Sequence, residues 1–179
     1  MPIRTSRFDV SSHDRSTISR LLDDVHGPHK SISLDSVLRQ ARTAAQELPR
    51  ALREFIYEFS IRELEHATCI FYEVEERWIG PTPTQYRPSG EEEVVDRHTT
   101  LHVLLASLLG EPFTWSTIQS GYLVNDIIPI PEHAAQVASS GSSAIFDLHT
   151  EDAFHSCAGA FLGLFLSSKY RRRNRTRNY

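Results

Sequence analysis

The chain has 179 residues, of which 40% are apolar and 23% charged, so it can bury one ordinary globular core but is short for two. Its 19 basic and 23 acidic residues give a net charge of −4, which argues against a general nucleic-acid-binding protein. The distribution is uneven: six of the basic residues lie in residues 169–179, and the other 168 residues carry 13 basic against 23 acidic side chains, a net charge of −10. We therefore expect an acidic body and a basic tail.

Two cysteines, Cys69 and Cys157, are too few for a disulfide framework and lack metal-ligand spacing, which indicates a reducing, cytoplasmic location. Both are expected to be small buried hydrophobic residues. The N-terminal residues show no apolar signal-peptide core. The longest apolar run, residues 157–166, is ten residues long, whereas a membrane-spanning helix needs about 20. The sequence therefore predicts no membrane anchor.

Helical spacing dominates the first third of the chain. Ser16 and Thr17 precede a first apolar face that ends at Gly27-Pro28, and a second helical stretch runs from Ser33 past Pro49 to Ile56. These segments form a helical N-terminal lead-in, residues 1–64. Next, Cys69–Val74 is rich in strand formers, and a loop follows at Gly80–Thr84.

The second half changes its periodicity. Glu91–Leu109 is predicted to be the clearest helix, with Gly110 as the residue that ends it. Three short apolar runs after it are separated by turn residues and predict successive strands at Tyr122–Ile130, Ala144–Leu148 and Ala160–Leu166. Helices come first and strands later, so the predicted fold class is α+β.

Histidines supply the candidate chemistry. His98 and His102 are four residues apart, so they share one face of the predicted helix and can hold a metal; a solvated or partly buried pair is the competing and commoner interpretation. His149 and Glu151 are two residues apart and project from one face if that segment is a strand. They would supply two ligands of the 2-His-1-carboxylate set that leaves open positions on Fe(II). Alone, such a pair is a weak signal.

The string Leu148-His149-Thr150-Glu151-Asp152-Ala153-Phe154-His155 resembles the iron site of the clavaminate-synthase-like, or taurine-dioxygenase-type, Fe(II)/2-oxoglutarate oxygenases, which include arginine and asparagine β-hydroxylases of antibiotic biosynthesis. Three further stretches resemble the same family in the same order, at residues 79–83, 108–115 and 121–129. The resemblance covers about residues 65–166 and implies the first part of a double-stranded β-helix, or jelly roll.

The resemblance implies roles for individual residues. His149 and Glu151 would bind Fe(II), and Glu151 would also lie beside a free L-amino acid substrate that is arginine-like or asparagine-like. Gln119 is similar to a substrate-contacting glutamine of the family. Ser139 is the candidate for facing the substrate carboxylate, with a flexible turn as the competing interpretation. His155 matches a supporting residue of the string, not a third ligand. The implied cofactors are Fe(II) and the co-substrate 2-oxoglutarate; the residues that bind 2-oxoglutarate are not identified.

The chain departs from the family pattern after the iron string. Ser156, Cys157 and Ala158 stand where relatives carry a proline, an aromatic residue and an arginine, and no histidine follows His155. We therefore expect a C-terminally truncated core, weak iron binding and a disordered tail at residues 167–179. The tail has three interpretations: an electrostatic patch for polyanions, a solvated terminus, or the out-of-frame product of an interrupted gene.

Three functions follow. The first is an Fe(II)/2-oxoglutarate-dependent dioxygenase, an oxidoreductase that hydroxylates an unactivated carbon of a free amino acid. The second is a catalytically inactive remnant that acts only as a binding or interaction protein. The third, a polyanion-binding protein acting through residues 169–179, is disfavoured by the acidic body, so we expect no specific nucleic acid partner.

Overall fold

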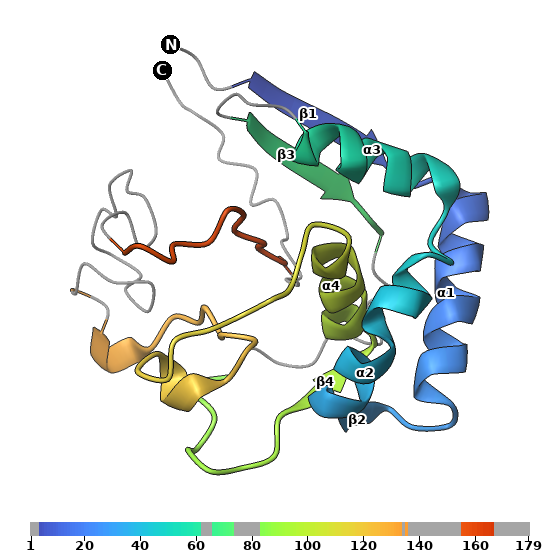
Figure 1. Ribbon diagram of the computed structural model, residues 1–179. Helices are drawn as coiled ribbons and strands as arrows, with labels where there is room; N and C mark the ends of the chain where they lie inside the picture. The colour runs from blue at the N-terminus through green and yellow to red at the C-terminus, as the bar shows by residue number, and fades with distance from the viewer. Residues whose placement is uncertain (1–3, 62–65, 74–82, 134, 136–154, 167–179) are drawn as a thin grey trace, which may run out of the picture.

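The computed structural model describes residues 4–61, 66–73, 83–133, 135 and 155–166. Helices and short strands both occur in this part of the chain, so the predicted α+β class is confirmed (Figure 1). The helices are α1 (Ser12–His26), α2 (Leu34–Ala45), α3 (Arg50–Ser60) and α4 (Arg97–Ser107), and the strands are β1 (Arg4–Asp9), β2 (Ser31–Ser33), β3 (His66–Phe71) and β4 (Val94–Asp96). None of the described helices is both long and apolar enough to cross a bilayer.

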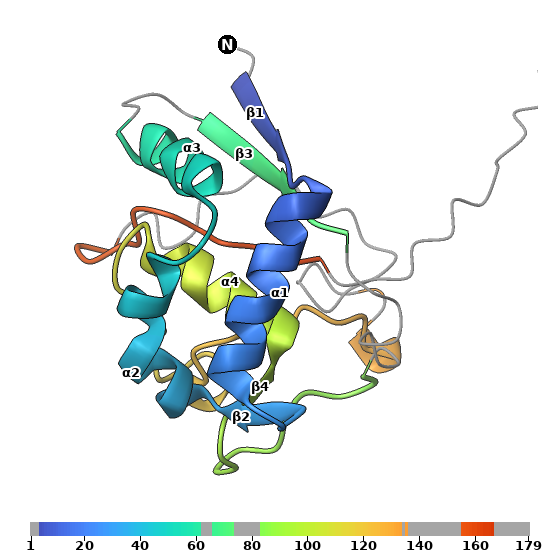
Figure 2. The same ribbon diagram turned by 90° about the vertical axis from the view of Figure 1, so that its right-hand side faces the viewer.

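Helix α4 lies at the centre of the helical layer, with α1 and α2 beside it (Figures 1 and 2). The core is built mainly from aliphatic side chains of the four helices, because each helix repeats apolar residues at a three-to-four-residue spacing. Its most deeply buried members include Ile18, Leu22, Val37, Leu48, Leu52, Leu101 and Leu104. This core contains residues from both sides of the predicted boundary at residue 64, which stays a prediction.

The first helix begins earlier than expected. The Ser11 side chain accepts a hydrogen bond from the Asp14 backbone N–H at 3.1 Å, which satisfies one of the unpaired donors of the first turn. The predicted start at Ser16 is therefore wrong, although the end at Gly27 is confirmed, with a φ of +56° and its N–H bonded to the Asp23 carbonyl. The second helical stretch is divided, as Pro49 stands at the N-cap of α3.

Two small sheets frame the helices. β1 and β3 are parallel, in register from Arg4 opposite His66 to Asp9 opposite Phe71, and β2 and β4 are antiparallel. The predicted strand at residues 69–74 thus lies earlier, at His66–Phe71. Side chains alternate along a strand, and Cys69 falls on the exposed face of β3. Cys157 is exposed as well, so the prediction of two buried cysteines is wrong.

Helix α4 is shorter than predicted, because Val94–Asp96 is extended and pairs with β2. The Asp96 carboxylate then caps the helix by accepting from the Thr99 N–H at 2.7 Å. The predicted helix start at Glu91 is therefore wrong by six residues.

Two of the three predicted strands are wrong as well. Residues 122–130 and 160–166 are described and form no strand; 3-10 turns lie at Gln119–Gly121 and Pro131–His133. Within the first run, the N–H groups of Leu123, Val124 and Asp126 donate to side chains rather than to a neighbouring strand. Within the second run, Phe161 and Phe165 contact rings on α3 and α4. The third predicted strand, Ala144–Leu148, lies outside the described residues.

Candidate functional site

The predicted iron and substrate residues divide into two groups. His149, Glu151 and Ser139 lie outside the described residues, so their roles stay predictions. Gln119 and His155 are described, and their contacts define the surroundings of the loop at residues 112–125 and of the end of the iron string.

His155, at the end of the string, is anchored on an aromatic loop. Its ring centroid lies 4.2 Å from that of Trp115 at an interplanar angle of 53°. Trp115 in turn meets Phe113 edge to face, with centroids 5.4 Å apart. The Nδ1 of His155 accepts a hydrogen bond from the Cys157 N–H at 3.0 Å. This arrangement agrees with a supporting position for His155, since one ring nitrogen already holds the backbone.

Gln119 sits on a tight turn of the same loop and is fixed at both ends of its amide. Its Nε2 donates to the Asp126 carbonyl at 2.8 Å, and its Oε1 accepts from the Asp126 N–H at 2.9 Å. Gln119 and Ser120 both have positive φ, 39° and 62°, a conformation that non-glycine residues rarely adopt. The amide pair with Asp126 therefore closes a turn that local backbone preference does not favour.

Glu93 binds the backbone of this loop through a pair of hydrogen bonds, which we call the Glu93 brace. Its two carboxylate oxygens accept from the consecutive N–H groups of Leu123 and Val124 at 2.9 and 2.8 Å. Arg87 lies 3.7 Å from the same carboxylate and 4.8 Å above the Tyr122 ring. Sequence reasoning missed this role because it placed Glu93 in the first turn of a helix. The pairing of β4 with β2, which ends that helix early, depends on contacts distant in sequence.

The Tyr122 hydroxyl adds hydrogen bonds between this loop and the backbone of Pro88 and Glu91. It donates to a backbone carbonyl, with the Pro88 oxygen at 2.6 Å and the Glu91 oxygen at 3.1 Å, and it accepts from the Glu91 N–H at 3.0 Å. The loop that carries Gln119 is thus tied to residues 87–93 by charged and neutral hydrogen bonds together.

The segment after the iron string covers α4. The Phe165 ring stacks on His98 at 6.1 Å and meets His102 at 6.0 Å, and Phe161 contacts Phe59 of α3 at 5.7 Å. Burial lowers the pKa of His102, and a hydrogen bond with the Gly163 backbone partly opposes that shift. The predicted pair on one helix face is thus partly buried, with His98 buried and His102 half-buried, and both rings pack against Phe165. Among the described residues, no group of three or more metal-binding side chains occurs.

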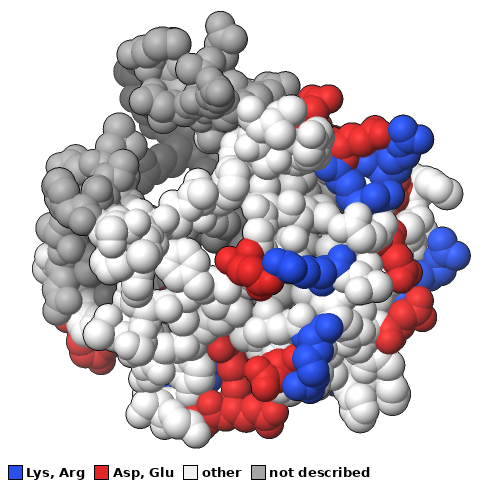
Figure 3. All heavy atoms as spheres, viewed as in Figure 1, with Lys and Arg blue, Asp and Glu red and all other residues white. Residues whose placement is uncertain are grey.

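Charge is unevenly placed on the surface. In Figure 3, most charged side chains lie on the right-hand side, over the helices, and acidic side chains also lie along the lower edge, whereas the rest of the described left-hand side is largely uncharged. Residues 112–125 and 155–166 contain no Asp, Glu, Lys or Arg.

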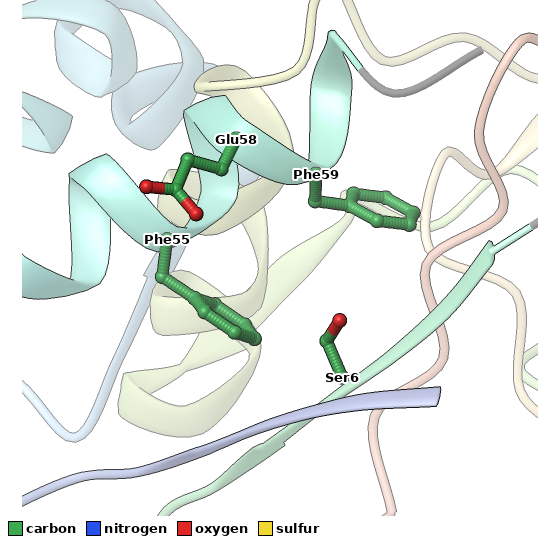
Figure 4. Close-up of a pocket in the computed structure, with 4 residues that line it drawn as sticks. All are labelled: Ser6, Phe55, Glu58 and Phe59. Atoms are coloured by element: carbon green, nitrogen blue, oxygen red, sulfur yellow. The ribbon is translucent and has the colours of Figure 1, made fainter. Parts of the chain in front are cut away.

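A shallow pocket lies elsewhere, between α3 and β1, lined by Ser6, Phe55, Glu58 and Phe59 (Figure 4). None of these four residues belongs to the loops around Gln119 or His155.

No family model matches the chain, but its sequence is similar to those of known hydroxylases. It is 31% identical over 164 residues to an L-ornithine/L-arginine 3-hydroxylase of Catenulispora acidiphila, covering 88% of this chain and 47% of the relative. It is 28% identical over 156 residues to an enduracididine beta-hydroxylase of Streptomyces hygroscopicus, covering 87% and 46%.

Solved structures of a non-heme iron oxygenase resemble the chain in fold and in sequence. The non-heme iron oxygenase OrfP in complex with Fe, succinate and (3S)-hydroxy-L-Arg matches with a TM-score of 0.72 and 30% identity over 84% of this chain and 45% of that one. OrfP in complex with Fe and alpha-ketoglutaric acid matches equally well, with a TM-score of 0.72, 31% identity and 48% of that chain covered. The chain spans about half the length of the relatives it matches. By sequence and by fold, the chain is a relative of the arginine-hydroxylase-like, non-heme iron and 2-oxoglutarate-dependent oxygenases.

Proposed function

We propose that this chain carries part of the active site of an Fe(II)/2-oxoglutarate-dependent hydroxylase whose substrate is a free basic L-amino acid of the arginine and ornithine kind. The observation that supports the proposal is the contact between His155, the last residue of the iron string, and the loop that carries Gln119. His155 closes the string and rests on Trp115, four residues before Gln119. The similarity to proteins named for arginine, ornithine and enduracididine hydroxylation supports the substrate class.

The donor set fits the metal. An imidazole from His149 and a carboxylate from Glu151 are ligands that suit non-heme Fe(II) and leave positions open for other ligands. When bound, iron with 2-oxoglutarate and O2 supplies the oxidising power that replaces C–H by C–OH. The protein's own residues would hold the substrate in place: Glu151 from the metal motif, Ser139 from the serine-rich segment that precedes it in sequence, and Gln119 from the loop at residues 112–125.

The described loops suit a site that must exclude water. Trp115 places its ring against His155 at the end of the iron string, Phe113 packs on Trp115, and loop residues 112–125 carry no charged side chain. The jelly-roll core remains part of the proposal, and its predicted strand at Ala144–Leu148 lies outside the described residues. The competing idea of an inactive interaction protein is not favoured by relatives that are hydroxylases.

A turnover assay tests this function. The protein is supplied with excess Fe(II), 2-oxoglutarate, O2 and L-arginine, and succinate and hydroxyarginine are measured by mass spectrometry. We expect hydroxyarginine from the parent and none from His149→Ala or Glu151→Ala. His29→Ala, which removes an exposed histidine far from the string in sequence, serves as the matched control and should retain turnover. Product formation that survives both ligand substitutions would overturn the assignment.

A further inference from the structure

We propose that Glu93 is a positioning residue for the amino-acid site: its carboxylate holds the loop at residues 122–126, and the loop in turn fixes the side-chain amide of Gln119. This inference rests on the proposed function, because the proposed amino-acid substrate is the ligand that the Gln119 amide would bind. Glu93 itself touches the loop backbone.

The first link is a carboxylate that grips two neighbouring amides. Each oxygen of Glu93 accepts one backbone N–H, from Leu123 and from Val124, and the side chain is only 14% exposed. Charge-assisted hydrogen bonds of this kind are shorter and stronger than neutral ones. Glu93 is itself held, because its backbone carbonyl accepts from the Leu34 N–H of α2 at 2.7 Å, and Arg87 lies beside its carboxylate.

The second link runs from the loop to Gln119. Two residues beyond Val124, both backbone groups of Asp126 bond to the Gln119 amide. An amide side chain has two donors and two acceptor lone pairs, so one donor and one acceptor of Gln119 remain after Asp126 is satisfied. A free amino acid presents an ammonium donor and a carboxylate acceptor on adjacent atoms, the complement of that remaining pair.

The third step is energetic. The turn at Gln119 and Ser120 has positive φ at two non-glycine residues, which costs free energy unless surrounding contacts compensate. Backbone hydrogen bonds from the N–H groups of Ile118, Gly121 and Tyr122 lie within the turn. The Asp126 pair and the Glu93 carboxylate, bound at residues 123 and 124, hold it from outside. Weakening the brace should therefore release the turn and let the Gln119 amide rotate away from one orientation.

The test compares Glu93→Gln with Glu92→Gln, a matched control that removes the same charge from the exposed neighbour. Glu93→Gln places an amide donor against one of two backbone donors. We expect backbone amide exchange at Leu123, Val124 and Asp126 to accelerate about tenfold or more, as for loss of a charge-assisted bond. The Gln119 side-chain NH2 signals, assigned with Gln119→Ala, should move toward solvent-exposed values, while exchange in α4 stays unchanged.

Titration with L-arginine gives the functional reading. The dissociation constant should rise about tenfold in Glu93→Gln and Gln119→Ala and stay at the parent value in Glu92→Gln. If Glu93→Gln does not fold, Glu93→Asp keeps the charge but shortens the side chain by one methylene and should shift the same signals. Unchanged Asp126 exchange and Gln119 signals in the folded variant would overturn the inference. Absence of L-arginine binding by the parent would contradict the proposed function, and the exchange data would still decide what Glu93 holds.

Discussion

A buried hydrogen bond between α1 and α4 offers the sharpest test of the packing. His26 Nε2 lies 2.8 Å from Thr100 Oγ1, with His26 2% and Thr100 0% exposed. Thr100→Val keeps the shape of the side chain but removes the hydroxyl, so a ring nitrogen of His26 loses its partner inside the core. An unsatisfied buried polar group costs about 1–3 kcal/mol. For a chain of this size, each kcal/mol lowers the melting temperature by about 2–4 °C.

Urea denaturation and thermal melting followed by circular dichroism would measure this loss. Thr99→Val, one residue earlier and not buried, is the control and should change stability by no more than about 0.5 kcal/mol. The double variant His26→Leu with Thr100→Val should cost less than the sum of the two single variants, because it leaves no polar group unpaired. A Thr100→Val penalty below about 0.5 kcal/mol, or strict additivity, would refute the reasoning.

Three further predictions concern the core, the segment after the iron string and pH. Leu104→Ala, at a fully buried position, should cost about 2–5 kcal/mol in urea unfolding, whereas the exposed Leu166→Ala should cost less than about 0.5; equal costs would contradict the core assignment. Phe165→Ala should lose about 0.5–1.5 kcal/mol per ring contact with His98 and His102 and speed amide exchange at residues 161–166; unchanged exchange would argue against docking. Burial lowers the pKa of both His26 and His102 below the value of about 6.5 that a histidine has in the unfolded chain. As the pH falls below that value, the unfolded state therefore binds more protons than the folded state. Stability should therefore be full above that pH and fall as the pH drops below it, by up to about 1.4 kcal/mol per pH unit for each histidine. Urea midpoints at pH 7.5 and 5.5 measure this, His26→Gln should reduce the fall, and a rise in stability on acidification would contradict it.

Local sequence signals located the helices well and the strands poorly. The apolar spacing of α2 and α3 is a local property, and it predicts the helical stretch that the structure divides into two helices at Pro49. β1 pairs with β3 about 60 residues away, so its partly charged sequence gives no local sign of a strand. The same limit explains α4: Asp96 is a recognisable cap, but only pairing with β2 shows that residues 94–96 are extended.

Sequence reasoning names candidate site residues where a contiguous string carries the chemistry, and those roles stay predictions. The iron string is a local pattern and Gln119 is part of a family-like stretch, so both could be named from sequence. The brace from Glu93 could not, because a carboxylate in a run of three glutamates looks like the acidic first turn of a helix. Only the fold brings that side chain to the amides of Leu123 and Val124.

Fe(II) binding under anaerobic conditions is the measurement that tests the central claim most directly. The parent chain, titrated by calorimetry in the presence of 2-oxoglutarate, should bind Fe(II) weakly at a single site, because His149 and Glu151 supply two protein ligands. His149→Ala and Glu151→Ala should each abolish that binding, and His29→Ala should leave it unchanged. Binding that is absent from the parent, or that persists in both ligand variants, would contradict the account.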